Sequence, residues 1–177
     1  MQTLLLEIAY ALYLIMPAYV ANAVPVLLGG GQAIDDGKVL SDGKPIFGSH
    51  KTVRGFLAGV MIGTAVGTVQ TAFLDYRIIP DFTPAFSFTI ILSLMLSIGA
   101  LTGDLVHSFI KRRIGIREGG SLPVADQLDF VVGAILFSFL VSTPPWLTIV
   151  LIFSITLPVH VLTNFLAYLL GIKKTPW

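Results

Sequence analysis

The sequence contains no cysteine, so disulfide bonds, thiolate metal sites and a cysteine nucleophile are all excluded. Charged residues are also scarce: they make up 12% of the chain, against about 25% in an ordinary soluble domain. The three histidines, His50, His107 and His160, lie far apart without a paired metal-ligand spacing, which argues against a histidine-based metal site. The composition therefore excludes several common kinds of active site and disfavours a soluble protein.

Long apolar stretches dominate what is present. Hydrophobic residues account for 55% of the 177 residues, and the mean hydropathy is +0.87. A membrane-spanning helix needs about 20 mainly apolar residues, and the chain has five such segments, at 3–28, 56–73, 85–106, 125–142 and 146–170. The sequence thus predicts an all-α integral membrane protein with five transmembrane helices in one transmembrane domain, residues 1–177.

Basic residues are unevenly distributed among the predicted loops. Of the 11 lysines and arginines, all except Arg77 lie in loops 29–55 and 107–124 or at the C-terminus. With five spans these three segments lie on the same side, and basic loops mark the cytoplasmic side. We therefore expect a multi-pass protein of the cell membrane whose N-terminus is outside and whose two polar loops and C-terminus are cytoplasmic.

The first polar loop is rich in glycine and lysine. Its Gly-Gly-Gly start and its Asp-Gly pairs predict turns, and glycine allows backbone N–H groups to approach a phosphate closely. The loop ends with Lys51, Thr52 and Arg54, directly before the second span. Phosphate binding and a plain flexible surface loop both fit this pattern, but no P-loop motif is present.

Two features of the first spans concern helix packing. Gly59, Gly63 and Gly67 recur every four residues, which favours close packing within the chain or between two chains. Asn22 is unusual inside a span. Its side chain is expected either to make an interhelical hydrogen bond or to contact substrate at the helix end.

The end of the third span carries a dense group of polar residues. In a helix, Asp104, Ser108, Lys111 and Arg112 share one face, whereas Arg113 lies on the opposite face. This group fits a phosphate or metal-phosphate site, or alternatively a basic helix cap that meets lipid headgroups. A carboxylate at the end of a membrane helix is costly, which favours a functional role.

Two further carboxylates, Asp126 and Asp129, lie three residues apart at the start of the fourth span and project from one helical face. With Asp104 they provide the oxygen ligands that Mg²⁺ prefers; a favourable interaction with the helix N-terminus is the alternative. Carboxylates for a metal beside cations for phosphate fit transfer between phosphate groups, in which a protein positions the reactants and neutralises charge.

These residues resemble the signature of the CTP-dependent phosphatidate cytidylyltransferase superfamily. That signature begins with Ser, two residues, Lys-Arg, four residues and Lys-Asp, and it ends with Asp-Arg-x-Asp. The matching segments here are Ser108, Lys111-Arg112, Arg117-Glu118, Asp126-Gln127-Leu128-Asp129 and, before the second span, Lys51-Thr52-Val53-Arg54-Gly55. The Gly-His-Gly-Gly insert of the bacterial enzymes is missing after Pro123, and the short chain is closer to the archaeal branch, the CDP-archaeol synthases.

The resemblance implies an enzyme of membrane phospholipid biosynthesis. It would transfer CMP from CTP to an isoprenoid ether-lipid phosphate, 2,3-bis-O-geranylgeranylglycerol 1-phosphate, giving CDP-activated unsaturated archaeol and pyrophosphate. The lipid phosphate is itself the nucleophile, so none is needed from the protein. No nucleic-acid partner is expected, and the oligomeric state is left open.

The resemblance also implies roles for particular residues. Asp104, Asp126 and Asp129 would bind Mg²⁺, and with Lys111 they would form the catalytic group. The residues expected to contact CTP and the lipid phosphate are Asn22, Lys51, Thr52, Arg54, Ser108, Arg112 and Arg117.

Two other classes remain open, a small membrane transporter and a structural membrane subunit. A transporter predicts polar residues deep within the spans, but Asn22, Gln70, His160 and Asn164 are few and scattered. No inverted repeat is apparent, and five spans do not halve evenly. A structural subunit predicts that the Asp and Lys positions tolerate alanine.

Overall fold

Five α-helices form the framework of the described chain. The structure is a computed structural model, and it describes residues 2–75 and 88–171. The helices are α1 (Gln2–Leu28), α2 (Val53–Asp75), α3 (Ile90–Arg113), α4 (Ala125–Ser138) and α5 (Trp146–Leu169). Among the described residues the only strand-like pairings are isolated bridges within the first polar loop, so the prediction of an all-α fold is confirmed.

Helix bounds differ most from the predicted ones at α3 and α4. α3 continues to Arg113, so residues 107–113 are helical rather than part of a loop. α4 ends at Ser138, before the predicted limit at 142, where the Ser138 hydroxyl bonds back to the Ile135 carbonyl at 2.8 Å. Residues 85–87, together with Arg77, Lys173 and Lys174, lie outside the described residues.

Four of the described helices, α1, α2, α3 and α5, are long and apolar enough to cross a membrane. α4 has only 14 residues, or about 21 Å at about 1.5 Å per residue, whereas the hydrocarbon core of a bilayer is about 30 Å thick. The prediction of five spans is therefore not confirmed, although five helices are present.

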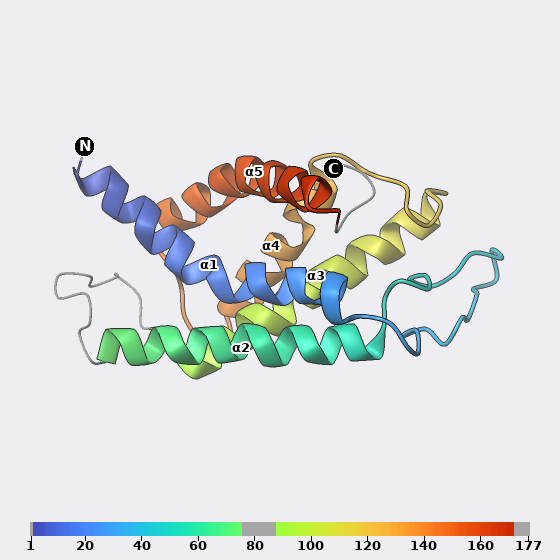
Figure 1. Ribbon diagram of the computed structural model, residues 1–177, viewed down its shortest axis with the longest axis horizontal. Coiled ribbons are helices and arrows are strands. Elements are labelled where there is room, and N and C mark those ends of the chain that lie inside the picture. Colours follow the sequence, from blue (N-terminus) through green and yellow to red (C-terminus); the bar gives the residue numbers. More distant parts are fainter. Residues whose placement is uncertain (1, 76–87, 172–177) are drawn as a thin grey trace.

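The helices place both polar loops at one end of the molecule. α1 packs between α2 and α5, and the loops 29–52 and 114–124 project together at the end away from the N-terminus (Figure 1). The core lies among α1, α3, α4 and the first half of α5. Its largest fully buried side chains include Leu14, Ile15, Leu92, Leu96 and Ile152.

The glycine stripe of α2 packs within the chain, as one of the two predicted alternatives. Gly59, Gly63 and Gly67 are all buried. A Cβ atom at Gly59 would come within 2.6 Å of the Ala21 carbonyl oxygen of α1, and one at Gly63 within 2.5 Å of the Ser97 hydroxyl of α3. Helix α2 can therefore lie against α1 and α3 only because these positions lack a side chain.

Replacing Gly63 by leucine is expected to lower the free energy of unfolding by about 3 kcal/mol, because a side chain there forces α1, α2 and α3 apart. The matched control is Ala65→Leu, since Ala65 lies exposed on the same helix. Thermal unfolding of both variants in the same detergent measures the difference. Equal melting temperatures for the two would contradict the packing described here.

Glycines also let α3 and α4 cross at backbone contact. A Cβ atom at Gly99 would come within 2.5 Å of the Gly133 carbonyl oxygen, and one at Gly103 would collide with the Asp129 carbonyl oxygen. The crossing therefore brings the segment around Asp104 on α3 directly against the segment around Asp129 on α4. This contact, more than any loop, positions the polar residues described next.

Candidate active site

The first polar loop is organised around a buried carboxylate. Asp35 is only 5% exposed. Its side chain accepts hydrogen bonds from the backbone N–H groups of Phe47 at 2.8 Å, Gly48 at 3.0 Å and Gly37 at 3.1 Å. Burial raises the pKa of the Asp35 carboxyl, but these N–H groups outweigh burial and hold that pKa below its ordinary value. The loop is thus an ordered structure, and the alternative of a plain flexible loop is not supported.

Replacing Asp35 by asparagine is expected to loosen loop 29–52 by about 2 kcal/mol, because charge-assisted hydrogen bonds to backbone N–H groups are lost. Hydrogen–deuterium exchange of the loop peptides measures this, with Asp36→Asn as the control, since Asp36 is exposed. The pKa of the Asp35 carboxyl is lower in the folded chain than in the unfolded chain. Its carboxylate therefore stabilises the wild-type loop fully at pH values above the unfolded-state pKa, and this stabilisation is lost as the pH falls through the folded-state pKa. Unchanged hydrogen–deuterium exchange of the loop peptides in Asp35→Asn would contradict the anchoring role of Asp35.

This loop is docked on the end of α3. The Arg113 guanidinium donates to Asp42 Oδ1 at 2.6 Å and to the backbone carbonyls of Lys44 and Pro45, and it lies over the Phe109 ring. Lys44 Nζ in return donates to the Arg113 carbonyl at 3.1 Å. Arg113 lies away from the site, as its helical phase predicts, and the structure adds that it fastens the loop.

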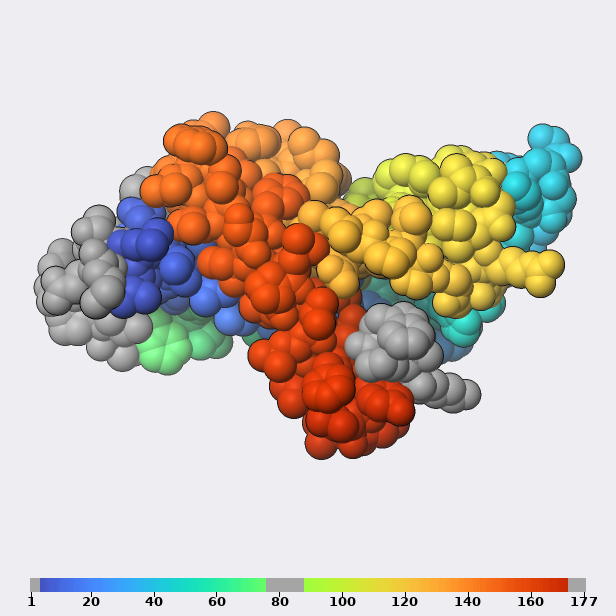
Figure 2. All heavy atoms as spheres, turned by 90° about the horizontal axis from the view of Figure 1, so that it is seen from above, coloured from blue at the N-terminus to red at the C-terminus, as the bar shows by residue number. Residues whose placement is uncertain are grey.

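A second contact joins the two polar loops. The Glu118 carboxylate accepts hydrogen bonds from the Ser49 hydroxyl at 2.7 Å and from the Ser49 backbone N–H at 3.2 Å. In the space-filling view, atoms of the first loop lie against the end of α3 (Figure 2). The two loops together therefore enclose polar space at the end of the helices.

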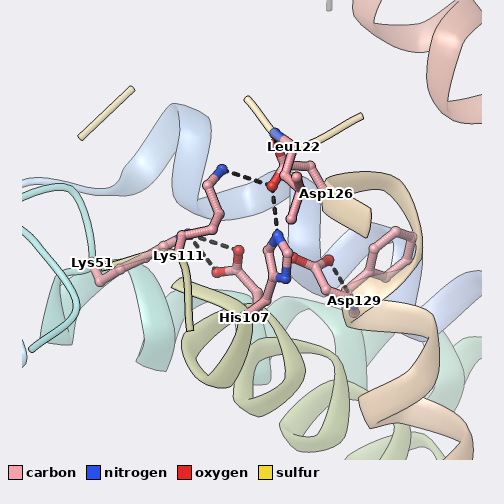
Figure 3. A network of polar contacts seen from close by, with 8 residues as sticks. Lys51, His107, Lys111, Leu122, Asp126 and Asp129 are labelled. Carbon is pink, nitrogen blue, oxygen red and sulfur yellow. Dashed lines mark hydrogen bonds and ion pairs between the residues drawn. The ribbon is translucent and has the colours of Figure 1, made fainter. Parts of the chain in front are cut away.

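Lys51, at the end of the first loop, reaches α3. Its ammonium group lies 2.7 Å from Asp104 Oδ1 and 2.6 Å from Asp104 Oδ2 (Figure 3). Neither side chain is fully buried, at 28% and 24% exposed. The ion pair connects residues that lie 53 positions apart in the sequence.

Asp126 is the centre of a second polar network (Figure 3). Its Oδ1 atom lies 2.7 Å from both Lys111 Nζ and His107 Nε2, and its Oδ2 atom accepts the backbone N–H of Leu122 at 2.7 Å. Val124 precedes this helix with φ 67° and ψ −51°, and the N–H of Ala125 bonds the Pro123 carbonyl. This is a γ-turn, a strained conformation for a branched residue, and it directs the first turn of α4 toward α3.

Asp129 lies one turn further along α4. Ligand atoms of Asp126, Asp129 and His107 all lie within 4.8 Å of one another, so these side chains could hold one metal ion. The donor set fits a divalent cation, because two carboxylates and an imidazole supply oxygen and nitrogen ligands, although Mg²⁺ favours the oxygens. The predicted shared face of Asp126 and Asp129 is confirmed. The structure groups His107 with them, whereas Asp104 is paired with Lys51.

Two residues of the polar stripe on α3 are buried. Ser108 is 8% and Arg112 6% exposed. The Nε and Nη1 atoms of Arg112 have no hydrogen-bond partner among the described residues. An unpaired buried guanidinium is costly, and Arg112 lines a cavity. The arrangement is therefore suited to an anionic ligand.

Two polar cavities meet at this end of the bundle. The larger, about 620 Å³, is lined by Lys51, Ser108, Lys111, Arg112 and Asp126 among others, with Glu118 at its loop side. The second, about 470 Å³, is lined by Asn22, Thr52 and Asp104 and shares Lys51 and His50 with the first. Lys51 thus stands between the two cavities.

A third cavity, of about 480 Å³, is mainly apolar and lies between α1 and α5. Its walls include Val20, Leu27 and Val159, and it shares His160 and Asn164 with the larger polar cavity. Asn164 Nδ2 lies 3.0 Å from His160 Nδ1, so these two residues share one face of α5. The apolar cavity therefore adjoins the polar one at these two residues.

Three predicted site residues have another role in the fold or lie outside the polar cavities. The Thr52 hydroxyl caps the N-terminus of α2, accepting the N–H groups of Gly55 at 3.1 Å and Gly30 at 3.2 Å. Arg54 and Arg117 are exposed and line neither polar cavity. A substrate contact by these residues stays a prediction.

Sequence reasoning missed His107, which it judged only by the spacing between histidines. Helical phase was the available signal, because His107 lies three residues after Asp104 and four before Lys111, on the same side of α3. His160 was counted among the scattered polar residues of the spans, although it lines the larger polar cavity.

Comparison with known proteins follows this geometry. A family model described as CarS-like, CDP-archaeol synthase, matches residues 2–177. The CDP-archaeol synthase of Methanocaldococcus jannaschii is 44% identical, covering 94% of this chain and 96% of that protein. That of Methanococcoides burtonii is 43% identical, covering 92% and 99%. A solved structure, described as an intramembrane enzyme for archaeal membrane lipids biosynthesis, is 35% identical with a TM-score of 0.75 and covers 87% of this chain and 92% of that chain.

Proposed function

The chain belongs to the CDP-archaeol synthase family, and on that premise we propose how its residues divide the work of cytidylyl transfer. Membership makes it a CTP-dependent cytidylyltransferase of archaeal lipid synthesis and a multi-pass membrane protein. The proposed acceptor is the ether-lipid phosphate that the family resemblance implies, 2,3-bis-O-geranylgeranylglycerol 1-phosphate. The observation that carries the proposal is the buried side chain of Arg112, whose Nε and Nη1 atoms have no partner among the described residues, in the same cavity wall as Asp126.

CTP occupies the larger cavity in this proposal. Lys111 and Arg112 neutralise its phosphates, and the Ser108 hydroxyl donates a hydrogen bond to a phosphate oxygen. All three line the cavity wall from α3. The bond between the α-phosphorus and the oxygen that bridges to the β-phosphorus breaks as a lipid phosphate oxygen attacks from the opposite side, and pyrophosphate leaves. The residues contribute by holding the reactants in line and by stabilising developing charge.

The carboxylates hold the metal in this proposal. Asp126 and Asp129 would bind Mg²⁺, with His107 beside them and Asp104 within reach of the same region. Mg²⁺, when bound, would neutralise phosphate charge and orient the triphosphate. A divalent cation would reduce the repulsion between these carboxylates and the phosphates of both substrates, which is the physical reason for expecting one.

Lipid chains occupy the apolar cavity between α1 and α5. Its aliphatic walls suit isoprenoid chains, and its polar end at His160 and Asn164 opens on the cavity assigned to CTP. A lipid that enters from the bilayer can thereby bring its phosphate to the nucleotide without leaving the membrane. Asn22, which lines both the apolar cavity and the second polar cavity, is assigned to the lipid headgroup.

The proposed topology has five crossings with the active site on the cytoplasmic side. Basic residues gather in the first polar loop and in the last turn of α3, next to the second loop, and the loops lie at one end of the molecule. In this arrangement α4 crosses as a short helix whose first turn lies at the site, while the N-terminus is outside. Cytoplasmic CTP would then reach the cavity directly.

Pyrophosphate release by the purified protein in detergent tests the function. CTP, Mg²⁺ and the isoprenoid glycerol phosphate are supplied together and then omitted one at a time, with a diacyl phosphatidate as the parallel acceptor. We expect release that requires all three components and is greatest with the ether lipid. No release with either lipid, from protein shown to be folded, would overturn the proposal and favour a transporter or a structural subunit.

A further inference from the structure

The two lysines of the site are not free to bind phosphate, because each already neutralises a carboxylate. Lys51 Nζ contacts both oxygens of Asp104, at 2.7 and 2.6 Å. Lys111 Nζ lies 2.7 Å from Asp126 Oδ1, the same atom that His107 approaches. A metal ion that coordinates either carboxylate through these atoms must therefore compete with an ammonium group for them.

We propose that Lys51 and Lys111 are exchangeable counter-ions: each holds its carboxylate before nucleotide binds, and moves to a phosphate when the metal ion and CTP arrive together. This inference rests on the proposed function, and it assigns a coupling between metal binding and nucleotide binding that the reaction alone does not require. Both lysines line the cavity assigned to CTP, so a side-chain rotation brings each ammonium group to the nucleotide.

The structure distinguishes these exchangeable cations from fixed ones. Lys51 and Lys111 each bind one carboxylate through a flexible stem, and both pairs are partly open to the cavity. Arg113 instead contacts three acceptors and stacks on Phe109. The first two can change partners at low cost, whereas Arg113 cannot.

Charge makes the exchange cooperative. A metal ion alone would release an ammonium group into a cavity that already holds the unpaired guanidinium of Arg112. A triphosphate alone that drew the two ammonium groups away would leave Asp104 and Asp126 uncompensated beside the phosphates. When both bind, the metal replaces the ammonium groups on the carboxylates, and the ammonium groups neutralise phosphates. Each ligand therefore raises the affinity for the other, and by the same factor.

Binding of Mn²⁺, followed by electron paramagnetic resonance of the free ion, tests this without turnover. The full-length protein in detergent is titrated with Mn²⁺ alone and with the non-transferable analogue α,β-methylene-CTP, after correction for Mn²⁺ bound by the analogue in solution. We expect the analogue to tighten Mn²⁺ binding by about tenfold or more. In Lys111→Met, Mn²⁺ alone should bind about tenfold tighter than in wild type, and the effect of the analogue should shrink.

Two further variants keep the test decisive. Lys51→Met should likewise bind Mn²⁺ alone more tightly than wild type and show a smaller effect of the analogue. If thermal unfolding shows that one of the two variants does not fold, the other still tests the inference. Lys38→Met is the matched control, because Lys38 is an exposed lysine of the first loop that lines neither polar cavity, and it should match wild type.

Mn²⁺ binding that is no tighter in Lys111→Met and Lys51→Met than in wild type would overturn the inference. So would a wild-type affinity that the analogue leaves unchanged while pyrophosphate release proceeds, and in that case the proposed function stands. Absence of both Mn²⁺ binding and pyrophosphate release in wild type would overturn the proposed function together with this inference.

Discussion

Asp126→Asn is expected to lower turnover at least about a hundredfold while the folded protein is still made. Asp126 Oδ1 lies within hydrogen-bond distance of Lys111 Nζ and His107 Nε2, and its Oδ2 atom accepts the Leu122 N–H. Asparagine has the same shape and keeps one carbonyl oxygen, so the first turn of α4 can still form. It loses the negative charge, and with it the ability to hold a divalent cation beside Asp129.

The assay for this variant is pyrophosphate release at saturating CTP, Mg²⁺ and lipid, with thermal unfolding measured on the same preparation. Asp36→Asn is the control, since Asp36 is an exposed loop carboxylate that lines neither polar cavity. Near-normal activity of purified Asp126→Asn would remove Asp126 from the metal site. Loss of activity together with loss of folding would assign Asp126 a structural role instead.

Arg112→Met is expected to separate stability from activity. The Arg112 guanidinium is buried with its Nε and Nη1 atoms unpaired, and a buried charge without a partner destabilises the fold. Methionine fills similar space without charge, so the free energy of unfolding should stay the same or rise by about 1 kcal/mol. The KM for CTP should rise about tenfold and kcat/KM fall about a hundredfold, because a charged hydrogen-bond donor to phosphate is lost.

The neighbouring arginine supplies the matched comparison. Arg113→Met removes the contacts to Asp42 and to the loop carbonyls, so it should lower stability by about 1–3 kcal/mol. Thermal unfolding and steady-state kinetics of both variants measure the change in stability and the change in activity that each substitution causes. An Arg112→Met protein that is less stable yet fully active would contradict the proposed role, because the guanidinium would then serve the fold alone.

The sequence predicts most of the framework, because apolar runs are long and polar residues gather between them. The ends of helices are harder to predict. Residues 139–141 are as apolar as those before them, yet α4 ends at Ser138. The chain continues in tighter turns, in which the Leu140 N–H bonds the Phe137 carbonyl and the Val141 N–H bonds the Ser138 carbonyl. Hydropathy averages over such local hydrogen bonds and therefore predicts a longer helix.

The sequence predicts those parts of the candidate site whose residues share one face of a single helix. Asp104, Ser108, Lys111 and Arg112 follow from spacing along one helix, as do Asp126 and Asp129. The pairing of Lys51 with Asp104 joins segments far apart in the chain, and no single-sequence pattern specifies it. The anchoring role of Asp35 depends equally on the fold of its own loop, which composition alone describes only as rich in turns.

The contact between the two polar loops has a consequence for synthesis of the chain. Ser49 and Glu118 lie 69 residues apart, and at about 5–20 residues per second a ribosome needs about 3–14 s to travel from one to the other. The first loop therefore leaves the ribosome well before the end of α3 and its neighbouring loop exist. During that interval the loop's own hydrogen bonds, including those to Asp35, can give it shape. Local order in the first loop thus prepares a surface on which a later helix completes the catalytic end.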